Sequence, residues 1–392
     1  MTVSRITAPF LSDPDLARVL GALEGAGHQA LVVGGAVRNA LLGVPVSDID
    51  IATSALPRDT MRIVARAGLR AVPTGIDHGT VTVLCKGRGF EVTTFRRDVQ
   101  TDGRHAVVAF SDDLAEDARR RDFTMNALYA TRTGEVLDPV GGLPDLAARR
   151  LRFVGDPAQR IAEDYLRILR FYRFLACYGR EADARALAAC RELRAGLSGI
   201  SRERIGHEMR KLLSAADPAP AVALMAEAGV LPLILPGADP GDLPDLVQVE
   251  REYGTGALPA FPRRLALLGP ADPVPALRLS RDEGRALDQI AQALALPPAL
   301  AAHRFGRTVA AQSVLIRAAR GQAPAFGWCH DIARGAAAVF PLAAADLMPA
   351  LQGEALGDAL RAARQAWTDS DFTLDRDALL CIARGNESQP DA

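Results

Sequence analysis

The sequence predicts an α+β protein, with a small mixed sheet and helices up to about residue 155 and helices alone beyond it. Three observations support this fold class. Short β-branched runs bounded by glycine, at 80–84 and 89–95, are typical of strands. They alternate with helical periodicities in the first part of the chain. Beyond Pro157 no strong strand signal remains, and Ala/Leu/Arg-rich helical periods are broken by Pro/Gly clusters.

Local signals place the elements of the first part in order. The strands at 80–84 and 89–95 are expected to share one sheet with the strand at 48–51. The predicted elements are a helix over 13–27 capped by Asp13, a strand over 31–33, a helix over 37–42, a strand over 48–51, a helix over 57–68, strands over 80–84 and 89–95, a loop over 97–112, a helix over 114–129 and a hairpin around Gly134.

The stretch from Leu31 to Leu42 joins a short apolar run, a glycine pair and an apolar-periodic segment. A strand, Gly34-Gly35 and a helix start present bare backbone N–H groups at a helix N-terminus. Such groups bind anions, phosphate above all. Taken alone, a glycine pair before a helix is usually only a tight turn.

Asp48 and Asp50 follow shortly afterwards, and residues two apart in a strand point to one face. Two crowded carboxylates repel each other, and a divalent cation relieves the repulsion; hard oxygen ligands suit Mg²⁺. A lone Asp-x-Asp is more often a solvated edge strand. Because the phosphate site and the carboxylate pair occur together, they indicate a nucleotidyl-transfer centre with Asp48 and Asp50 as metal ligands.

Two nearby features each allow two interpretations. Glu91 lies in a predicted strand, where it is either a third catalytic carboxylate near the metal or a charge on an exposed sheet face. The loop TGIDHGT, residues 74–80, is framed by Gly75 and Gly79 and so could be a mobile flap over a substrate. Its His78, taken alone, is more often a surface or capping histidine.

Residues 119–127 (RRRDFTMNA) place cations, a carboxylate and an amide within two turns of a predicted helix. A charge run is usually a solvated helix face. Here apolar neighbours bring Arg121, Asp122 and Asn126 close to buried surface, where charges tend to be paired or in use. Asp122 and Asn126 are four apart and share a face. They offer an acceptor and a donor suited to a ribose hydroxyl.

Residues 163–174 (EDYLRILRFYRF) predict one well-buried helix, because large apolar side chains surround it. On an ideal helix Asp164, Arg167 and Arg170 can line one pocket, whereas Arg173 points the opposite way from Asp164. Asp164 and Arg167 are either members of ion pairs between helices or a rigid acceptor and donor for a base edge. Arg173 serves phosphate, RNA or structure.

Length and composition narrow the class of protein. The 392 residues predict two or three domains. A net charge of −1 argues against a wholly electrostatic nucleic-acid binder, though not against a local basic groove. The five cysteines are scattered, which indicates neither zinc nor disulfides. No signal pattern and no membrane-length apolar run is present, so the cytoplasm is the expected location.

Six motifs occur in order along the chain: GGAVRN with SDID, TGIDHGT, EVTTFR, RRDFTMNA, DPVGG and EDYLRILRFYRF. Together they resemble the class II tRNA nucleotidyltransferase/poly(A) polymerase family, and within it CCA-adding enzymes most. The resemblance covers about residues 31–175, with weaker support to about 215. It implies a polymerase-β-like nucleotidyltransferase head, followed by an all-helical neck, body and tail.

The resemblance also implies roles for individual residues. Asp48 and Asp50 would hold two Mg²⁺ ions for a two-metal displacement. One departure is Asn39, where the family usually has aspartate, and it changes the charge beside the triphosphate. The residues implied in nucleotide binding are Gly34, Gly35 and Arg38 for the triphosphate, Arg121, Asp122 and Asn126 in the ribose-recognising segment, and Asp164 and Arg167 for the base edge. Arg170 and Arg173 of the same motif are further candidates for nucleotide binding, Arg170 in the pocket of Asp164 and Arg173 for phosphate.

The function implied is addition of C and A nucleotides to the 3′ end of tRNA from CTP and ATP. Alternatives are a bacterial poly(A) polymerase, an enzyme that adds only CC or only A, and an inactive RNA-binding relative. Loss of Asp48 or Asp50 would have indicated the last, and both are present. The domains expected are a head over 1–155, a neck with a nucleotide-template helix over 156–216, and a body and tail over 217–392 that grip the tRNA acceptor and T-arm.

Overall fold

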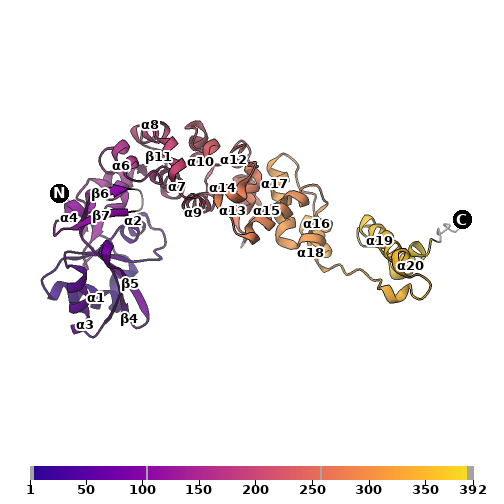
Figure 1. Ribbon diagram of the computed structural model, residues 1–392, viewed down its shortest axis with the longest axis horizontal. Helices are drawn as coiled ribbons and strands as arrows, with labels where there is room; N and C mark the ends of the chain where they lie inside the picture. The colour runs from indigo at the N-terminus through magenta and orange to yellow at the C-terminus, as the bar shows by residue number, and fades with distance from the viewer. Residues whose placement is uncertain (1–3, 103–104, 257, 386–392) are drawn as a thin grey trace. The chain divides into compact units, whose positions relative to one another are not determined.

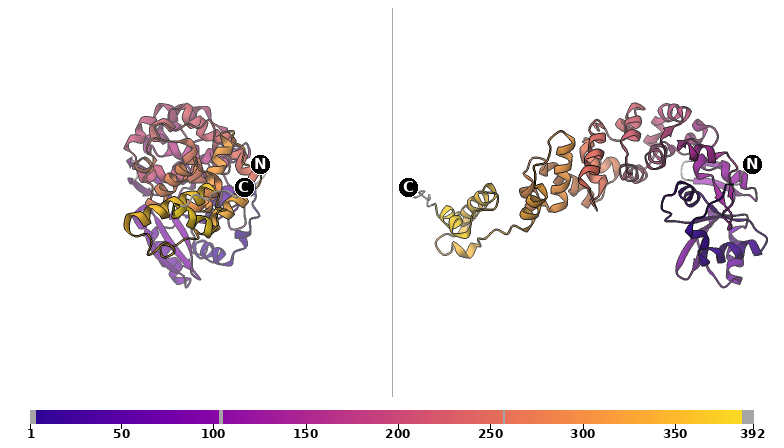
Figure 2. Two further views of the ribbon diagram at one scale, coloured as in Figure 1. Left: turned by 90° about the vertical axis from the view of Figure 1, so that its right-hand side faces the viewer. Right: turned by 180° about the vertical axis from the view of Figure 1, so that it is seen from behind.

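The computed structural model describes residues 4–102, 105–256 and 258–385. The chain divides into two compact units, one up to Ile234 and one from Leu235 (Figure 1). Every strand found in the described ranges belongs to the first unit, and beyond β11 (Glu181–Ala182) these ranges hold helices only (Figure 2). The predicted α+β class is therefore confirmed. None of the helices in the described ranges is long and apolar enough to cross a membrane.

The first unit is built on a seven-stranded mixed sheet. The strands at 80–84 and 89–95 pair in one sheet with the Asp50 strand, as predicted: β5 is antiparallel to β4 and parallel to β2. Strand β1 is antiparallel to β2. In spatial order the strands are β3 (Arg70–Gly75), β4 (Thr80–Cys85), β5 (Arg88–Thr94), β2 (Asp50–Thr53), β1 (Ala30–Val33), β8 (Tyr129–Ala130) and β9 (Val136–Leu137).

Helices pack on the sheet through residues that alternate along its strands. Helices α1 (Pro14–Gly25) and α3 (Pro57–Arg66) contact β1, β3 and β4 and begin at prolines, as predicted. Asp13 caps α1 through its carboxylate, which accepts the Asp15 N–H at 2.9 Å. Side chains of β1 and β2, Ala118 of α4 (Leu114–Arg119) and Val154 share one buried cluster.

The other elements of the first unit are short helices and two small strand pairs. They are α2 (Gly35–Leu42), η1 (Pro9–Ser12), η2 (Ile76–His78), η3 (Thr124–Asn126), α5 (Gly142–Ala147), α6 (Pro157–Glu163), α7 (Arg167–Tyr178), α8 (Ala184–Glu192), η4 (Arg194–Gly199), α9 (Arg202–Leu213), α10 (Ala219–Glu227), α11 (Leu231–Ile234), the antiparallel pair β6 (Arg96–Asp102) and β7 (His105–Phe110), and the parallel pair β10 (Arg150–Leu151) and β11.

The second unit is helical throughout its described residues. It holds a buried ion cluster in which Arg263 and Arg264 both donate to Glu250. Its elements are α12 (Leu243–Tyr253), α13 (Ala260–Leu268), α14 (Pro273–Leu277), α15 (Arg281–Ala293), α16 (Pro298–Phe305), α17 (Arg307–Ala319), α18 (Trp328–Ala337), η5 (Ala344–Asp346), α19 (Gly353–Asp369) and α20 (Arg376–Ala383).

Two predictions about local structure in the first unit are wrong. The expected loop over 97–112 is the hairpin β6–β7, whose tip at 103–104 lies outside the described residues. A hairpin satisfies its backbone groups by self-pairing, so it can form from a polar segment without apolar periodicity. The two-residue strand β11 likewise follows Pro157, where no strand was expected; it pairs with β10.

The expected helix over 114–129 is also wrong. It ends at Arg119, and Phe123 is extended, with φ −118° and ψ 146°. The Phe123 ring is fully buried among other rings, with centroid distances of 4.9 Å to Phe153 and 5.1 Å to Phe174. Burial of a large aromatic ring therefore outweighs local helix propensity in this segment.

Candidate active site

Sheet register brings the predicted phosphate site and the predicted carboxylates into one row. Val33, the residue before Gly34, pairs with Asp50 across the β1–β2 ladder. Asp50 in turn pairs with Glu91 across the parallel β2–β5 ladder. Three neighbouring strands thus place Val33, Asp50 and Glu91 in one row, and Gly34 follows directly at the end of that row.

The glycine pair adopts the geometry expected of a helix N-terminus. Gly34 caps α2 with φ 69° and ψ −118°, a conformation that glycine alone adopts readily. A Cβ built on Gly34 would lie 3.6 Å from the Asn126 carbonyl oxygen and 3.7 Å from Arg121 Nη1. The start of α2 therefore lies beside Asn126 and Arg121, so an anion bound at this helix N-terminus would have an arginine close by.

Asp48, Asp50 and Glu91 line one cavity of about 620 Å³. The strand begins at Asp50 rather than at Asp48, but all three carboxylates are exposed, whereas Ile49 and Ile51 between and beside them are buried. Desolvation by the surrounding cavity walls, then the charge of Glu91, raises the pKa of Asp50 above its ordinary value. A cation in this cavity would favour the ionised form of Asp50.

The carboxylate donors suit a hard divalent cation. Ser47 donates its hydroxyl hydrogen bond to Asp48 Oδ2 at 2.9 Å, which orients one of them. Across the part of the chain that the structure describes, no three His, Cys, Asp or Glu side chains are grouped closely enough to hold a metal ion by themselves. A cation held by Asp48 and Asp50 would therefore take further oxygens from a substrate or water.

Arg121 is held beside this cavity by residues that the sequence did not single out. It donates to Asp117 Oδ2 at 2.9 Å and to the Tyr129 hydroxyl at 3.0 Å, and that hydroxyl donates to Asp117 at 2.7 Å. Burial alone would lower the pKa of Arg121, but Tyr129 and Asp117 outweigh it and raise that pKa. The guanidinium is thus a permanent, fixed cation.

Asp122 and Asn126 meet, as predicted, but not on one helix face. The segment after α4 is extended at Phe123 and then forms η3, so the Asn126 amide donates to Asp122 Oδ1 at 3.0 Å. Asp122 Oδ2 accepts two bonds from Arg170, at 2.5 and 3.0 Å. Burial acts to raise the pKa of Asp122, but Arg170 and the hydrogen bonds lower it well below its usual range.

The predicted helix over 163–174 is broken at Asp164. This residue ends α6 with φ −156°, and its carboxylate accepts the Leu166 N–H, so that α7 starts separately at Arg167. Asp164 pairs with Arg204 of α9 at 2.6 Å, and Arg167 donates to Glu163. Asp164 and Arg167 therefore belong to two different ion pairs, because the chain turns between them.

A second cavity, of about 320 Å³, brings the remaining predicted residues together. Its lining includes Asp122, Asp164, Arg167 and Arg170, together with Arg204. Asp164, Arg167 and Arg170 thus line one pocket, as predicted. Arg173 lies outside this lining and donates to Glu208 of α9 at 2.5 Å.

Arg38 is nearly buried at the start of α2. It donates to the Asn126 side-chain oxygen at 2.6 Å and to the Asn39 side-chain oxygen at 2.8 and 3.1 Å. Asn39 in turn donates to the Pro45 carbonyl at 2.7 Å. The amide at position 39 therefore joins Arg38 to the turn that leads to Asp48.

The loop of residues 74–80 contains the single turn η2, and His78 in it is exposed. The guanidinium of Arg96 donates to the His78 backbone carbonyl. Gly79 has φ 82°, and a Cβ built there would lie 2.9 Å from the Phe110 ring. Glycine is thus needed at this position for both conformation and space.

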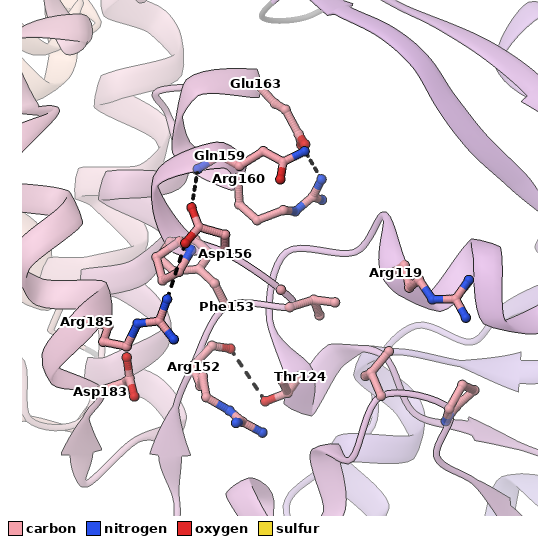
Figure 3. Close-up of a pocket in the computed structure, with 15 residues that line it drawn as sticks. Arg119, Thr124, Arg152, Phe153, Asp156, Gln159, Arg160, Glu163, Asp183 and Arg185 are labelled. Atoms are coloured by element: carbon pink, nitrogen blue, oxygen red, sulfur yellow. Dashed lines mark hydrogen bonds and ion pairs between the residues drawn. The ribbon is translucent and has the colours of Figure 1, made fainter.

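A separate cavity of about 730 Å³ contains none of the predicted site residues (Figure 3). Its polar side chains largely pair with one another, as Arg185 does with Asp156 at 3.3 Å. Arg160 and Glu163 of α6 form an ion pair in its wall, and Arg160 also donates to the backbone carbonyl of Arg121 at 3.0 Å. This cavity therefore adjoins the site through α6, and the candidate active site is the pair of smaller cavities.

The partners Asp117, Tyr129, Glu163, Arg204 and Glu208 were missed at the level of sequence. Glu163 adjoins Asp164 within a motif, which was a usable signal. Asp117 is four residues from Arg121 and Tyr129 is eight residues from it, so these two contacts are also local. Arg204 and Glu208 act through contacts with residues distant in sequence, such as the 40-residue separation between Asp164 and Arg204. No local periodicity identifies such partners.

Comparison with known proteins agrees with this geometry. A family model described as "Poly A polymerase head domain" matches residues 30–152, and one described as "Probable RNA and SrmB- binding site of polymerase A" matches 182–241. The mitochondrial CCA tRNA nucleotidyltransferase 1 of Mus musculus is 43% identical over 214 residues, which are 53% of this chain and 49% of the relative. The CCA-adding enzyme of Leuconostoc citreum is 42% identical over 221 residues, 56% of this chain and 54% of the relative. The chain spans about half the length of these relatives in the matches.

Solved structures extend the similarity over the whole chain. The Bacillus stearothermophilus CCA-adding enzyme in complex with CTP superposes with a TM-score of 0.75 and 30% identity, covering 97% of this chain and 98% of its own. The Thermotoga maritima CCA-adding enzyme complexed with tRNA has a TM-score of 0.71 over 99% of this chain and 100% of its own, and at 19% identity shows the shared fold. The chain therefore belongs to the class II tRNA nucleotidyltransferase/poly(A) polymerase family, the family that contains the CCA-adding enzymes.

Proposed function

We propose that this protein adds C and A nucleotides to the 3′ end of tRNA, using CTP and ATP. The observation that carries the proposal is the register that aligns Val33, Asp50 and Glu91 across three strands, with Gly34 directly after Val33. It sets an anion-binding helix start beside a carboxylate cavity, the two parts that nucleotidyl transfer needs. The relatives named above as CCA-adding enzymes support this choice of reaction.

In the proposed reaction the 3′-hydroxyl oxygen of the RNA attacks the α-phosphorus of the nucleotide. The bond to the bridging oxygen breaks, and pyrophosphate leaves. Asp48 and Asp50 would hold the divalent cation, for which we propose Mg²⁺ because their ligand atoms are hard oxygens. When bound, the metal supplies activation of the attacking hydroxyl and charge stabilisation of the leaving group. Glu91 adds negative charge beside Asp50 and so strengthens cation binding.

The chain's own groups would bind and orient the nucleotide. The backbone N–H groups after Gly34 and Gly35, with Arg38, would hold the triphosphate. Asp122 and Asn126, joined at 3.0 Å, would orient the ribose hydroxyls, and Arg121 would lie on the phosphate side. The fixed geometry of these groups lowers the entropy cost of aligning the reactants.

Nucleotide choice is assigned to the cavity that Asp164, Arg167 and Arg170 line. A carboxylate offers acceptors and a guanidinium offers donors, so together they can read the Watson–Crick edge of cytosine or adenine. Their ion pairs with Arg204 and Glu163 would hold both groups in one orientation. Arg173, bonded to Glu208, is assigned to positioning α7 and to backbone phosphate.

We further propose a head over 1–155, a neck over 156–216 and a body and tail over 217–392. The helical parts would bind the tRNA acceptor and T-arm through phosphate contacts, by shape rather than sequence. The match of residues 182–241 to an RNA-binding family model supports this assignment. We propose the cytoplasm as the location.

The deciding experiment uses purified protein, Mg²⁺ and a tRNA that lacks CCA, with labelled CTP and ATP supplied singly and together. Addition of CCA followed by a stop supports the proposal. A long A tail would identify a poly(A) polymerase instead, and addition of only CC or only A would identify a partial enzyme. No incorporation under any condition would refute nucleotidyl transfer to tRNA.

A further inference from the structure

The guanidinium of Arg38 is held from two sides. On the α2 side its hydrogen-bond acceptors are the side-chain oxygens of Asn39 and Asn126. On the other side two aromatic rings of α7 cover it, with its Cζ 3.7 Å from the Tyr178 centroid and 5.3 Å from the Phe174 centroid. Only 5% of Arg38 is exposed, so these contacts decide where its charge lies.

Arg38 differs from the arginines around it in the charge of its partners. Its direct partners are two neutral amides and two rings, which leave its positive charge available to an anion. Four neighbouring arginines each bind a carboxylate directly: Arg121 binds Asp117, Arg167 binds Glu163, Arg170 binds Asp122 and Arg173 binds Glu208.

The position of that charge suits a phosphate at the start of α2. A Cβ built on Gly35 would lie 3.7 Å from Arg38 Nη2, so the guanidinium is next to the bare helix N-terminus. Tyr178 is the last residue of α7, the helix that begins at Arg167. One rigid helix thus carries a base-side residue at its start and the ring over Arg38 at its end.

We infer that Tyr178 is a positioning residue, which holds the Arg38 cation against the triphosphate site by stacking and so links that site to α7. The inference rests on the proposed function, because that function supplies the triphosphate that Arg38 would bind. A tyrosine face attracts a guanidinium through its quadrupole, whereas an aliphatic side chain of similar bulk does not. Tyr178 itself touches neither the proposed metal ligands nor the base cavity lining.

The test measures binding of inorganic pyrophosphate to the full chain by titration calorimetry. Tyr178→Leu should weaken binding about threefold to tenfold, because the cation–π contact is lost. Tyr178→Phe, which keeps the ring, should bind within about twofold of wild type. Tyr178→Met is a second variant of similar volume in case the leucine variant folds poorly. Tyr253→Leu, on α12 in the second unit, is the matched control and should not change binding.

A double-mutant cycle with Arg38→Gln separates positioning from general structural damage. If Tyr178 acts through Arg38, Tyr178→Leu has no further effect once Arg38→Gln is present. An equal loss in both backgrounds would overturn the inference, as would wild-type binding by both Tyr178→Leu and Tyr178→Met or absence of pyrophosphate binding by the wild type. If the wild-type protein binds pyrophosphate but adds no nucleotide, the proposed function is refuted. The double-mutant cycle would then still decide whether Tyr178 positions Arg38.

Discussion

Replacing Asp122 by Asn tests whether the carboxylate between the two halves of the site is both a structural and a ribose-binding group. Asp122 accepts hydrogen bonds from Arg170, from the Asn126 amide and from the Phe123 N–H. Asparagine keeps the shape but removes the charge. Its NH₂ or oxygen then faces the Arg170 guanidinium, which loses the carboxylate at 2.5 Å and keeps only the more distant Glu208, at 3.8 Å.

The expected loss of stability lies between two known limits. Removing one partner of a buried ion pair costs about 3–5 kcal/mol, and removing an exposed one about 0–1 kcal/mol. The Asp122 side chain is 11% exposed and that of Arg170 is 32% exposed. Solvent therefore screens part of the interaction, and Asp122→Asn should cost about 2 kcal/mol, or about 4–8 °C in the melting temperature.

The measurement is urea and thermal unfolding, followed by CTP against dCTP incorporation. Discrimination against dCTP should fall about tenfold or more, since an acceptor for a ribose hydroxyl is removed. The control is Glu181→Gln, which breaks the exposed Arg150–Glu181 pair and should cost less than about 1 kcal/mol. The stability difference between wild type and Asp122→Asn should persist above the ordinary aspartate pKa and vanish as the pH falls through the lowered pKa of Asp122.

Two results would refute this reasoning. Unchanged melting temperature in Asp122→Asn would mean that the Arg170 pair contributes nothing measurable. Reduced stability with unchanged CTP preference would restrict Asp122 to structure and remove it from ribose recognition.

Three further predictions concern the carboxylate cavity and its neighbour. Asp50→Ala should lower addition more than about 100-fold while tRNA binding, measured by gel shift, is retained; retained addition would exclude Asp50 as a metal ligand. Glu91→Gln removes one cause of the raised pKa of Asp50, so the acid limb of the pH–rate profile should move to lower pH; an unmoved limb would show that Asp50 does not set it. Asn39→Asp removes the N–H donor to the Pro45 carbonyl and places a carboxylate against the Arg38 guanidinium. Because that carboxylate offsets the charge of Arg38, the KM for CTP should rise about threefold to tenfold. An unchanged or lower KM would contradict that effect.

Local structure near the first glycine pair could be predicted because its signals are short-range. The helix cap at Asp13, the strand before Gly34 and the helix after it depend on residues within a few positions of one another. Gly34 has a positive φ, which depends only on this residue being glycine. The prediction that the strand carrying Glu91 shares one sheet with the Asp50 strand is also confirmed.

Predictions failed where distant contacts outweigh local preference. The segment at Phe123 is extended because its ring enters an aromatic cluster built from α7 and the strand region at Phe153. The helix breaks at Asp164, where the carboxylate accepts the Leu166 N–H before α7 and binds Arg204 of α9. Neither contact leaves a periodic trace in the sequence around these residues.

The sequence by itself determined which groups could carry the chemistry: a glycine pair before a helix, two aspartates two apart, and an arginine-rich apolar segment. Residue type and spacing are sufficient for that, because they decide charge, hydrogen-bonding capacity and local conformation. Only the tertiary structure decided which groups meet. Strand register places Asp50 opposite Glu91. Helix packing brings Asp164 into an ion pair with Arg204, and Arg173 into an ion pair with Glu208. Register and packing depend on the burial of the whole core, which no local window contains.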